Sequence, residues 1–291
     1  MDNPIDPNAY PSAVGFNTLL EGPTGTGKTH ALGTLVDTGV DVFVVFLESG
    51  QETLYGYWTD RGLPIPPNLH VHIVKPATAS FTELLDSAKK TNTLSHDVLA
   101  KMTDPQRTKY DGYIHLLTAL NNFTDSRTGE TFGSIDSWGI DRVIAIDGLT
   151  GINRFAMQLV AGGKAARTQA EWGQAQFYVE ELVQKLTNGC KCHFVLIAHI
   201  ERETDLVLGG SKITMSTLGK ALAPKIPQMF SDVVLCKRDG DKYQWSTAEA
   251  QADLKMRNLP LSSTLKPDFK LIFNKWFSRI KGVHDDSTET E

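Results

Sequence analysis

The chain has 291 residues, a formal net charge of −5, 41% hydrophobic residues and 22% charged residues, as in an ordinary globular protein of one large domain or two small ones. This balance excludes a chain that is basic throughout, but it leaves room for a local nucleic-acid site. No apolar stretch approaches the roughly 20 residues that span a bilayer, and the N-terminus lacks the features of a secretion signal. We therefore expect a cytoplasmic protein.

Short apolar runs rich in β-branched residues alternate with amphipathic stretches along the chain. The runs predict strands at 15–21, 41–48, 69–75, 142–147 and 193–199. The amphipathic stretches predict helices at 28–37, 79–90, 151–160 and 169–187. Because the strands are apolar on both faces, they suit a parallel sheet that helices cover on both sides. The expected fold class is α/β, with a mostly parallel, doubly wound sheet.

The first predicted strand runs into EGPTGTGKTH (21–30), which has the Gly-x-x-x-x-Gly-Lys-Thr spacing of a P-loop. Its glycines let backbone N–H groups point at phosphate oxygens, and the following helix presents its positive end. Lys28 can reach the β- and γ-phosphates, and the Thr29 hydroxyl can ligate Mg²⁺. The expected cofactors are ATP and Mg²⁺, and the expected nucleotide-binding residues are Gly22, Pro23, Thr24, Gly25, Thr26, Gly27, Lys28, Thr29 and His30.

Residues 94–135 break the alternation of strands and helices, and we expect a helical insertion followed by a loop at one edge of the sheet. Further on, DVVLCKRDGDKYQWST predicts an antiparallel hairpin that turns at Asp239 and Gly240. The acidic, polar residues 283–291 are expected to be disordered. The expected organisation is one domain over 1–282, followed by this tail.

Three polar residues end predicted strands where active groups collect in open α/β sheets. Asp147 closes RVIAID, as in a Walker B strand, and can hold Mg²⁺ through water. Gly148 follows it, where many ATPase motors carry the glutamate that activates water. The predicted base is therefore Glu48, after the strand at 41–48, and His199 is the predicted sensor of the γ-phosphate. The alternatives are a turn-capping Glu48 and an ordinary strand-end His199.

This arrangement of P-loop, glutamate, aspartate and polar sensor resembles the RecA-like ATPases over residues 15 to 275, and within them the phage-encoded recombinases and single-strand annealing proteins. The resemblance places Glu48 on the catalytic glutamate, Asp147 on the Walker B aspartate and Tyr55 on the tyrosine that stacks on adenine. His199 stands where the family usually has glutamine. RecA's N-terminal polymerisation helix and C-terminal domain have no counterpart, so ring, filament and monomer stay open.

The resemblance implies DNA, expected to be single-stranded, as the partner in recombination, annealing or replication. Loops 161–168 and 201–220 occupy the places of RecA's two DNA-binding loops. Basic loops that contain glycine suit contacts with a phosphate backbone, although acidic residues dilute the charge of the second loop. The candidate DNA contacts are Lys164, Arg167, Arg202, Lys212 and Lys220.

A late stretch, ADLKMRNLP, places Lys255 and Arg257 two residues apart on one face of a predicted strand. The resemblance implies that such cations reach the ATP of a neighbouring subunit, where they would stabilise charge on the transferring phosphoryl group. A homo-oligomer with shared ATP sites is therefore expected. The alternative is a solvated edge strand with two ordinary surface charges.

Two other functions fit a P-loop. A small-molecule kinase would need a lid with several arginines, but the insertion at 94–135 carries only four scattered cations. An assembly module that ATP switches, with slow turnover, is compatible with Gly148 and His199. Cys190, Cys192 and His193 crowd together, but they offer no second ligand pair, so structural use is expected rather than a metal site.

Overall fold

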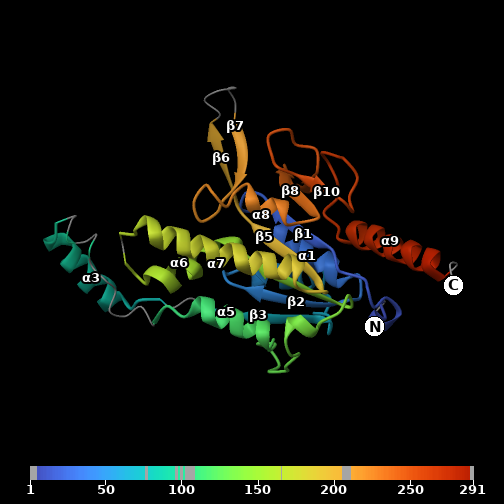
Figure 1. Ribbon diagram of the computed structural model, residues 1–291, viewed down its shortest axis with the longest axis horizontal. Helices are drawn as coiled ribbons and strands as arrows, with labels where there is room; N and C mark the ends of the chain where they lie inside the picture. The colour runs from blue at the N-terminus through green and yellow to red at the C-terminus, as the bar shows by residue number, and fades with distance from the viewer. Residues whose placement is uncertain are drawn as a thin grey trace.

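The computed structural model describes residues 5–75, 78–95, 98, 101, 109–164, 166–204 and 211–288. Their main sheet has the strand order β10-β8-β1-β5-β4-β2-β3, with helices on both faces (Figure 1). Its parallel strands are β1 (Asn17–Glu21), β2 (Asp41–Phe46), β3 (Leu69–Ile73), β4 (Arg142–Asp147), β5 (His193–Ala198) and β8 (Asp232–Asp239). This architecture confirms the predicted α/β class and all five predicted strands.

The helices are α1 (Lys28–Val36), α2 (Gln51–Thr59), α3 (Phe81–Thr93), α5 (Gly112–Asn121), α6 (Leu149–Ala161), α7 (Gln169–Asn188), α8 (Lys225–Gln228) and α9 (Lys270–Thr288). Short 3₁₀ turns lie at Pro7–Ala9 and Ile135–Ser137. Two helices begin with a capping box. The box of α3 consists of Ser80 and Glu83, and that of α7 consists of Thr168 and Glu171. The four predicted helices therefore begin within two residues of their expected positions.

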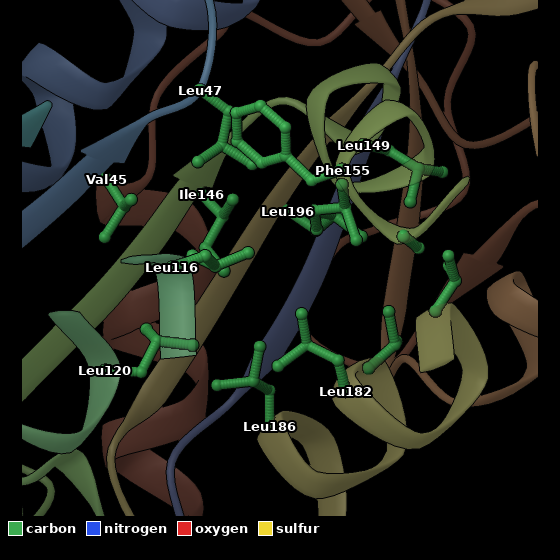
Figure 2. Close-up of a cluster of buried hydrophobic side chains, with 14 of the residues drawn as sticks. Val45, Leu47, Leu116, Leu120, Ile146, Leu149, Phe155, Leu182, Leu186 and Leu196 are labelled. Atoms are coloured by element: carbon green, nitrogen blue, oxygen red, sulfur yellow. The ribbon is translucent and has the colours of Figure 1, made fainter. Parts of the chain in front are cut away.

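Alternation along the strands divides the interior into two cores. Phe43 and Val45 of β2 pack with α5, α6, α7 and α8 on one face of the sheet, and Figure 2 shows part of this core. Val42 and Val44 point to the other face, where α1, α2 and α9 pack. Because both faces of each central strand are buried, these strands read as continuous apolar runs in the sequence.

The predicted late hairpin is present. Strand β9 (Lys242–Ser246) pairs antiparallel with β8, and Gly240 takes a φ of +58° in the turn. Strand β10 is shorter than the sequence predicts, since only Lys255–Met256 pair with the start of β8.

The insertion lies at one edge of the sheet, beside β3. The Ser126 N–H donates to the Val71 carbonyl at 2.7 Å, and the Arg127 guanidinium donates to the Leu69 carbonyl. The helix α5 within this segment is not a mere addition, because its Leu116 and Leu120 are buried in the first core. In Figure 1, α3 lies well to one side of the sheet.

At the C-terminal end, α9 continues to Thr288, so it includes the first residues of the tail that the sequence predicts to be disordered. Residues 289–291 lie outside the described residues. In the part of the chain that the structure describes, no helix combines the length and apolar character that a bilayer crossing requires.

Candidate functional site

The carboxyl ends of four neighbouring strands, β1, β5, β4 and β2, form the candidate site. In the register of the sheet, Glu21 lies opposite Ala198, and Asp147 lies between Ile197 and Phe46. The P-loop, His199, Asp147 and the segment with Glu48 therefore leave the sheet side by side. The strand before Glu48, β2, pairs directly with the Asp147 strand, β4.

The P-loop has the backbone that its glycines predict. Gly25 and Gly27 have φ values of +76° and +77°, a region that favours glycine. At Gly22, a Cβ atom would meet the Cys236 carbonyl oxygen at 2.4 Å, so the loop and β8 approach too closely for a side chain. No side chain caps α1, which leaves the N–H groups of its first turn for an anion.

Lys28 is buried inside the loop. Its Nζ donates to the carbonyls of Gly22 and Pro23 at 2.8 and 2.7 Å, and burial lowers its pKa. The ammonium group is thus held at the mouth of the loop by two backbone oxygens. A phosphate oxygen that enters the loop would compete with them for this group.

The P-loop and the Asp147 strand meet in one short contact. The Thr29 hydroxyl donates to Oδ2 of Asp147 at 2.7 Å, and Asp147 is largely buried. Burial raises the pKa of Asp147, and the nearby Glu48 carboxylate adds to this effect, whereas Thr29, Lys28 and His199 oppose it. One hydroxyl and one carboxylate oxygen are ligands that Mg²⁺ prefers, so these residues fit the expected cation.

Gly50 brings the segment with Glu48 over Asp147. A Cβ atom on Gly50 would lie 3.0 Å from Oδ2 of Asp147 and 3.2 Å from the Phe46 ring. Half-buried Glu48 lies two residues before it, close enough to act on the charge of Asp147. Sequence reasoning missed Gly50, although a glycine between a strand-end acid and a helix was a usable signal.

His199 joins the site to a projecting hairpin. It is half-buried directly after β5, and its carbonyl accepts the Ser216 N–H at 2.8 Å. The hairpin consists of β6 (Ile200–Thr204) and β7 (Ser211–Met215), and it rises away from the main sheet in Figure 1. His199 therefore lies between Asp147 and the root of this hairpin.

A groove beside the P-loop is flanked by two tyrosines. The Tyr57 ring lies 5.0 Å from the His30 ring, and the Tyr243 ring from β9 lies 2.9 Å from the Cβ position of Gly27. Both tyrosines line an open groove of about 710 Å³. Tyr55 does not line it: its charged neighbours are Arg127 and Asp125. The placement of Tyr55 on adenine stays a prediction, and on α2 it is Tyr57 whose ring faces the P-loop helix.

The predicted basic loop at 201–220 folds largely as the β6–β7 hairpin, with 205–210 outside the described residues. Its lysines lie near carboxylates: Lys220 Nζ is 2.9 Å from Glu203, and Lys212 Nζ is 3.4 Å from Asp253. Arg202 is exposed. The groove at this hairpin is lined by both lysines and also by Glu201, Glu203 and Asp253, so carboxylates outnumber lysines in it.

In the other predicted DNA loop, at 161–168, Lys164 forms an ion pair at the start of α7. Its Nζ lies 2.8 Å from Oε1 of Glu171, the acidic member of the capping box. Arg167 is exposed nearby. Of this pair, only Arg167 presents a charge that no neighbouring carboxylate balances in the described residues.

Lys255 and Arg257 lie at the opposite edge of the sheet from the P-loop. Lys255 pairs with Val233 near the start of β8, and its Nζ donates to the Gln228 carbonyl at 2.9 Å. Arg257 follows β10 and is exposed. Any role at an ATP would thus concern the ATP of another subunit, which stays a prediction.

No family model matches the chain, and no curated protein matches it in sequence. Among solved structures, the chain is similar to one described as the crystal structure of the RadB recombinase, with 15% identity and a TM-score of 0.36. The match covers 82% of this chain and 84% of that chain.

Proposed function

We propose that the chain is a Mg²⁺-dependent ATPase of the RecA-like kind that acts on DNA. The observation that carries this proposal is the contact between Thr29 and Asp147 at 2.7 Å, directly below a glycine-lined loop that ends in a helix N-terminus. A P-loop threonine and a strand-end aspartate at this distance form a two-oxygen site beside the position of the phosphates.

The loop and Lys28 supply the binding of the phosphates. Backbone N–H groups of the loop and of the first turn of α1 would hold phosphate oxygens, and Lys28 would exchange its two carbonyl partners for them. Bound Mg²⁺ would neutralise charge on the β- and γ-phosphates, with Thr29 and Asp147 as its protein partners.

Glu48 is the general base in this proposal. Its position beside Asp147, without a hydrogen bond to the described residues, leaves the carboxylate free to orient or deprotonate a water molecule. His199 would report the state of the γ-phosphate to the β6–β7 hairpin, to whose root its carbonyl is bonded. Gly148 cannot take either role, since it has no side chain.

The groove between Tyr57 and Tyr243 would hold the nucleobase. Aromatic faces next to the P-loop suit stacking, which contributes about 1–3 kcal/mol per base. Replacement of both tyrosines by alanine should raise the Kd for ATP by about tenfold or more, whereas Tyr55→Phe should leave it unchanged. An unchanged Kd in the double variant would show that the nucleobase does not bind in this groove.

The finer proposal is a phage-type protein that acts on single-stranded DNA in recombination, annealing or replication, as a ring or filament. The resemblance described in the sequence analysis supports this proposal, as does the distance of Lys255 and Arg257 from the P-loop of their own subunit. Electron microscopy with an ATP analogue, with and without single-stranded DNA, tests the assembly. Monomers under every condition would contradict it.

The central experiment measures phosphate release by the wild type and by Lys28→Ala, with circular dichroism to verify folding. Lys28→Ala should lose turnover, because the lysine is the point charge for the phosphates. Stimulation of phosphate release by single-stranded DNA separates this function from a small-molecule kinase, which would transfer the phosphoryl group to an acceptor. Retained turnover in folded Lys28→Ala would refute the ATPase proposal.

A further inference from the structure

A second concave site lies at the amino edge of the sheet, away from the P-loop. We name it the amino-edge cleft: it measures about 500 Å³ and is lined by Lys255, Arg257 and Arg279 together with the amides Asn17, Asn188 and Gln228. Asn17 begins β1, so the cleft opens at the end of the strand opposite to the one that leads into the P-loop.

The charge of the amino-edge cleft is not balanced. Its lining contains three cations and no Asp or Glu. None of these cations forms an ion pair with a carboxylate within the described ranges: Lys255 donates to a backbone carbonyl and Arg279 to an amide oxygen. The groove at the β6–β7 hairpin differs, because carboxylates accompany its lysines. Of these two grooves, the cleft is the one whose lining offers a net attraction for an anion.

Buried Asp232 fixes the cations in place without neutralising them. Its Oδ1 accepts hydrogen bonds from the backbone N–H groups of Arg257 and Asn258 at 2.8 and 2.7 Å. Its Oδ2 accepts one from the side-chain amide of Asn258 at 2.7 Å. The Asn258 amide oxygen in turn accepts a guanidinium N–H of Arg279 at 3.0 Å. The carboxylate is thus occupied by backbone and amide donors, and the head groups of Arg257 and Arg279 stay available to a ligand.

The positive charge extends beyond the cleft. Residues 254–282 contain seven Lys and Arg side chains and one acidic side chain, Asp268, in a protein whose net charge is −5. On α9, Lys275 and Arg279 are one turn apart and both are exposed. A small anion needs a single cluster of donors, whereas a row of cations with interspersed amides suits a chain of phosphates.

We infer that the amino-edge cleft and the adjoining face of α9 bind the sugar–phosphate backbone of a single nucleic-acid strand. The amides can donate to phosphate and sugar oxygens, which positions a strand without reading its sequence. This inference rests on the DNA partner in the proposed function and is independent of the ATPase activity.

The test is fluorescence anisotropy with a labelled oligo-deoxythymidine and the full chain, without nucleotide, at several salt concentrations. Lys255→Ala/Arg257→Ala/Arg279→Ala should weaken binding about 10²-fold at 0.1 M salt. The slope of log K against log salt should fall in magnitude by about 2, because each phosphate contact on a single strand contributes about 0.7. The matched control, Lys109→Ala/Lys225→Ala/Lys237→Ala, removes the same charge from lysines that are paired with carboxylates, and should bind within a factor of about two of wild type.

A single variant, Arg257→Glu, provides a second measurement in case the triple variant does not fold. Among the described residues, the Arg257 side chain forms no hydrogen bond or ion pair, so this substitution should leave the fold intact. Equal loss of binding in both triple variants, or normal binding in Arg257→Glu, would overturn the inference. A mixture of Lys28→Ala with the cleft variant tests whether the ligand of these cations is the ATP of a neighbouring subunit. If the mixture regains hydrolysis and the cleft variant binds DNA normally, the cations serve that ATP and the proposed nucleic-acid site is refuted. Loss of nucleotide-free DNA binding in the cleft variant and in Arg257→Glu, with normal binding in the lysine control, supports it.

Discussion

The groove at the β6–β7 hairpin and the amino-edge cleft contain similar cations but differ in what surrounds them. In the hairpin groove, Lys212 and Lys220 lie beside carboxylates, and exposed pairs of this kind contribute little. In the cleft, three cations share a lining that contains no acidic side chain. We infer that a basic loop in a sequence indicates an anion site only when its charges stay unpaired after folding.

The largest effect should come from the nucleotide edge. Glu48→Gln keeps the shape of the side chain but removes the base, so turnover should fall by about 10²–10⁴-fold, while ATP binding and nucleotide-free DNA binding stay normal. A coupled phosphate-release assay and anisotropy measure the two properties. The control is Glu52→Gln, on an exposed acid in the first turn of α2. Loss of turnover in Glu52→Gln instead would move the base to that residue.

A second effect tests the close approach above Asp147. Gly50→Ala places a methyl group 3.0 Å from Oδ2 of Asp147, which should displace the Glu48 segment and lower turnover by up to about 10²-fold. Gly173→Ala in α7 is the control, because a Cβ atom there meets nothing within 4 Å. If turnover in Gly50→Ala matched that of Gly173→Ala, the segment would not need its present path.

A third prediction concerns acidity at the same edge. Burial, with a smaller contribution from Asp253, raises the pKa of Glu21 from 4.5 to about 7. The native state then binds the proton more tightly than the unfolded state, so the free energy of unfolding falls as the pH rises from about 4.5 to 7. Glu21→Gln should remove this loss, which is on the order of 3 kcal/mol at pH 8.

Urea unfolding at pH 4 and pH 8 checks this expectation. The gain of Glu21→Gln over wild type should appear at pH 8 and largely vanish at pH 4. The same gain at both pH values would mean that packing, not titration, explains the effect. Asp253→Asn provides a comparison with an exposed neighbour and should change the pH dependence less.

The smallest effect should come from the hairpin. Lys212→Ala/Lys220→Ala should change nucleotide-free DNA binding by less than about threefold, because both lysines already lie beside carboxylates. The anisotropy assay described for the cleft applies without change. A loss as large as that of the cleft variant would reverse the comparison and restore the hairpin as the main DNA surface.

Local patterns predicted much of this fold. The glycines of the P-loop, the turn at Gly240 and the strand that ends at Asp147 each depend on neighbours in sequence, so their positions could be predicted. The position of Tyr57 could not be predicted in this way, because the rotation of α2 about its axis decides whether Tyr55 or Tyr57 faces His30. That rotation follows from packing against α1, which spacing alone does not reveal.

Long-range partners explain the remaining differences. Lys212 meets Asp253 because β7 lies beside residues 251–253, and Lys220 meets Glu203 of β6 although 17 positions separate them in the chain. Arg279 joins the cleft through Asn258, which lies 21 positions earlier in the chain. A count of cations along the sequence therefore identified basic segments but could not show which charges remain unpaired.

Strand β8 gives the two candidate sites a common support. Its first residue, Asp232, accepts the backbone N–H of Arg257, which lines the amino-edge cleft, and the Cys236 carbonyl packs against Gly22 of the P-loop. Four residues of extended chain separate these points by about 13 Å. Ligands at the two ends of the strand would not compete for space, but a shift of the strand would change the geometry of both sites. Any change that nucleic acid makes in ATP affinity must then be matched by an equal change that ATP makes in nucleic-acid affinity.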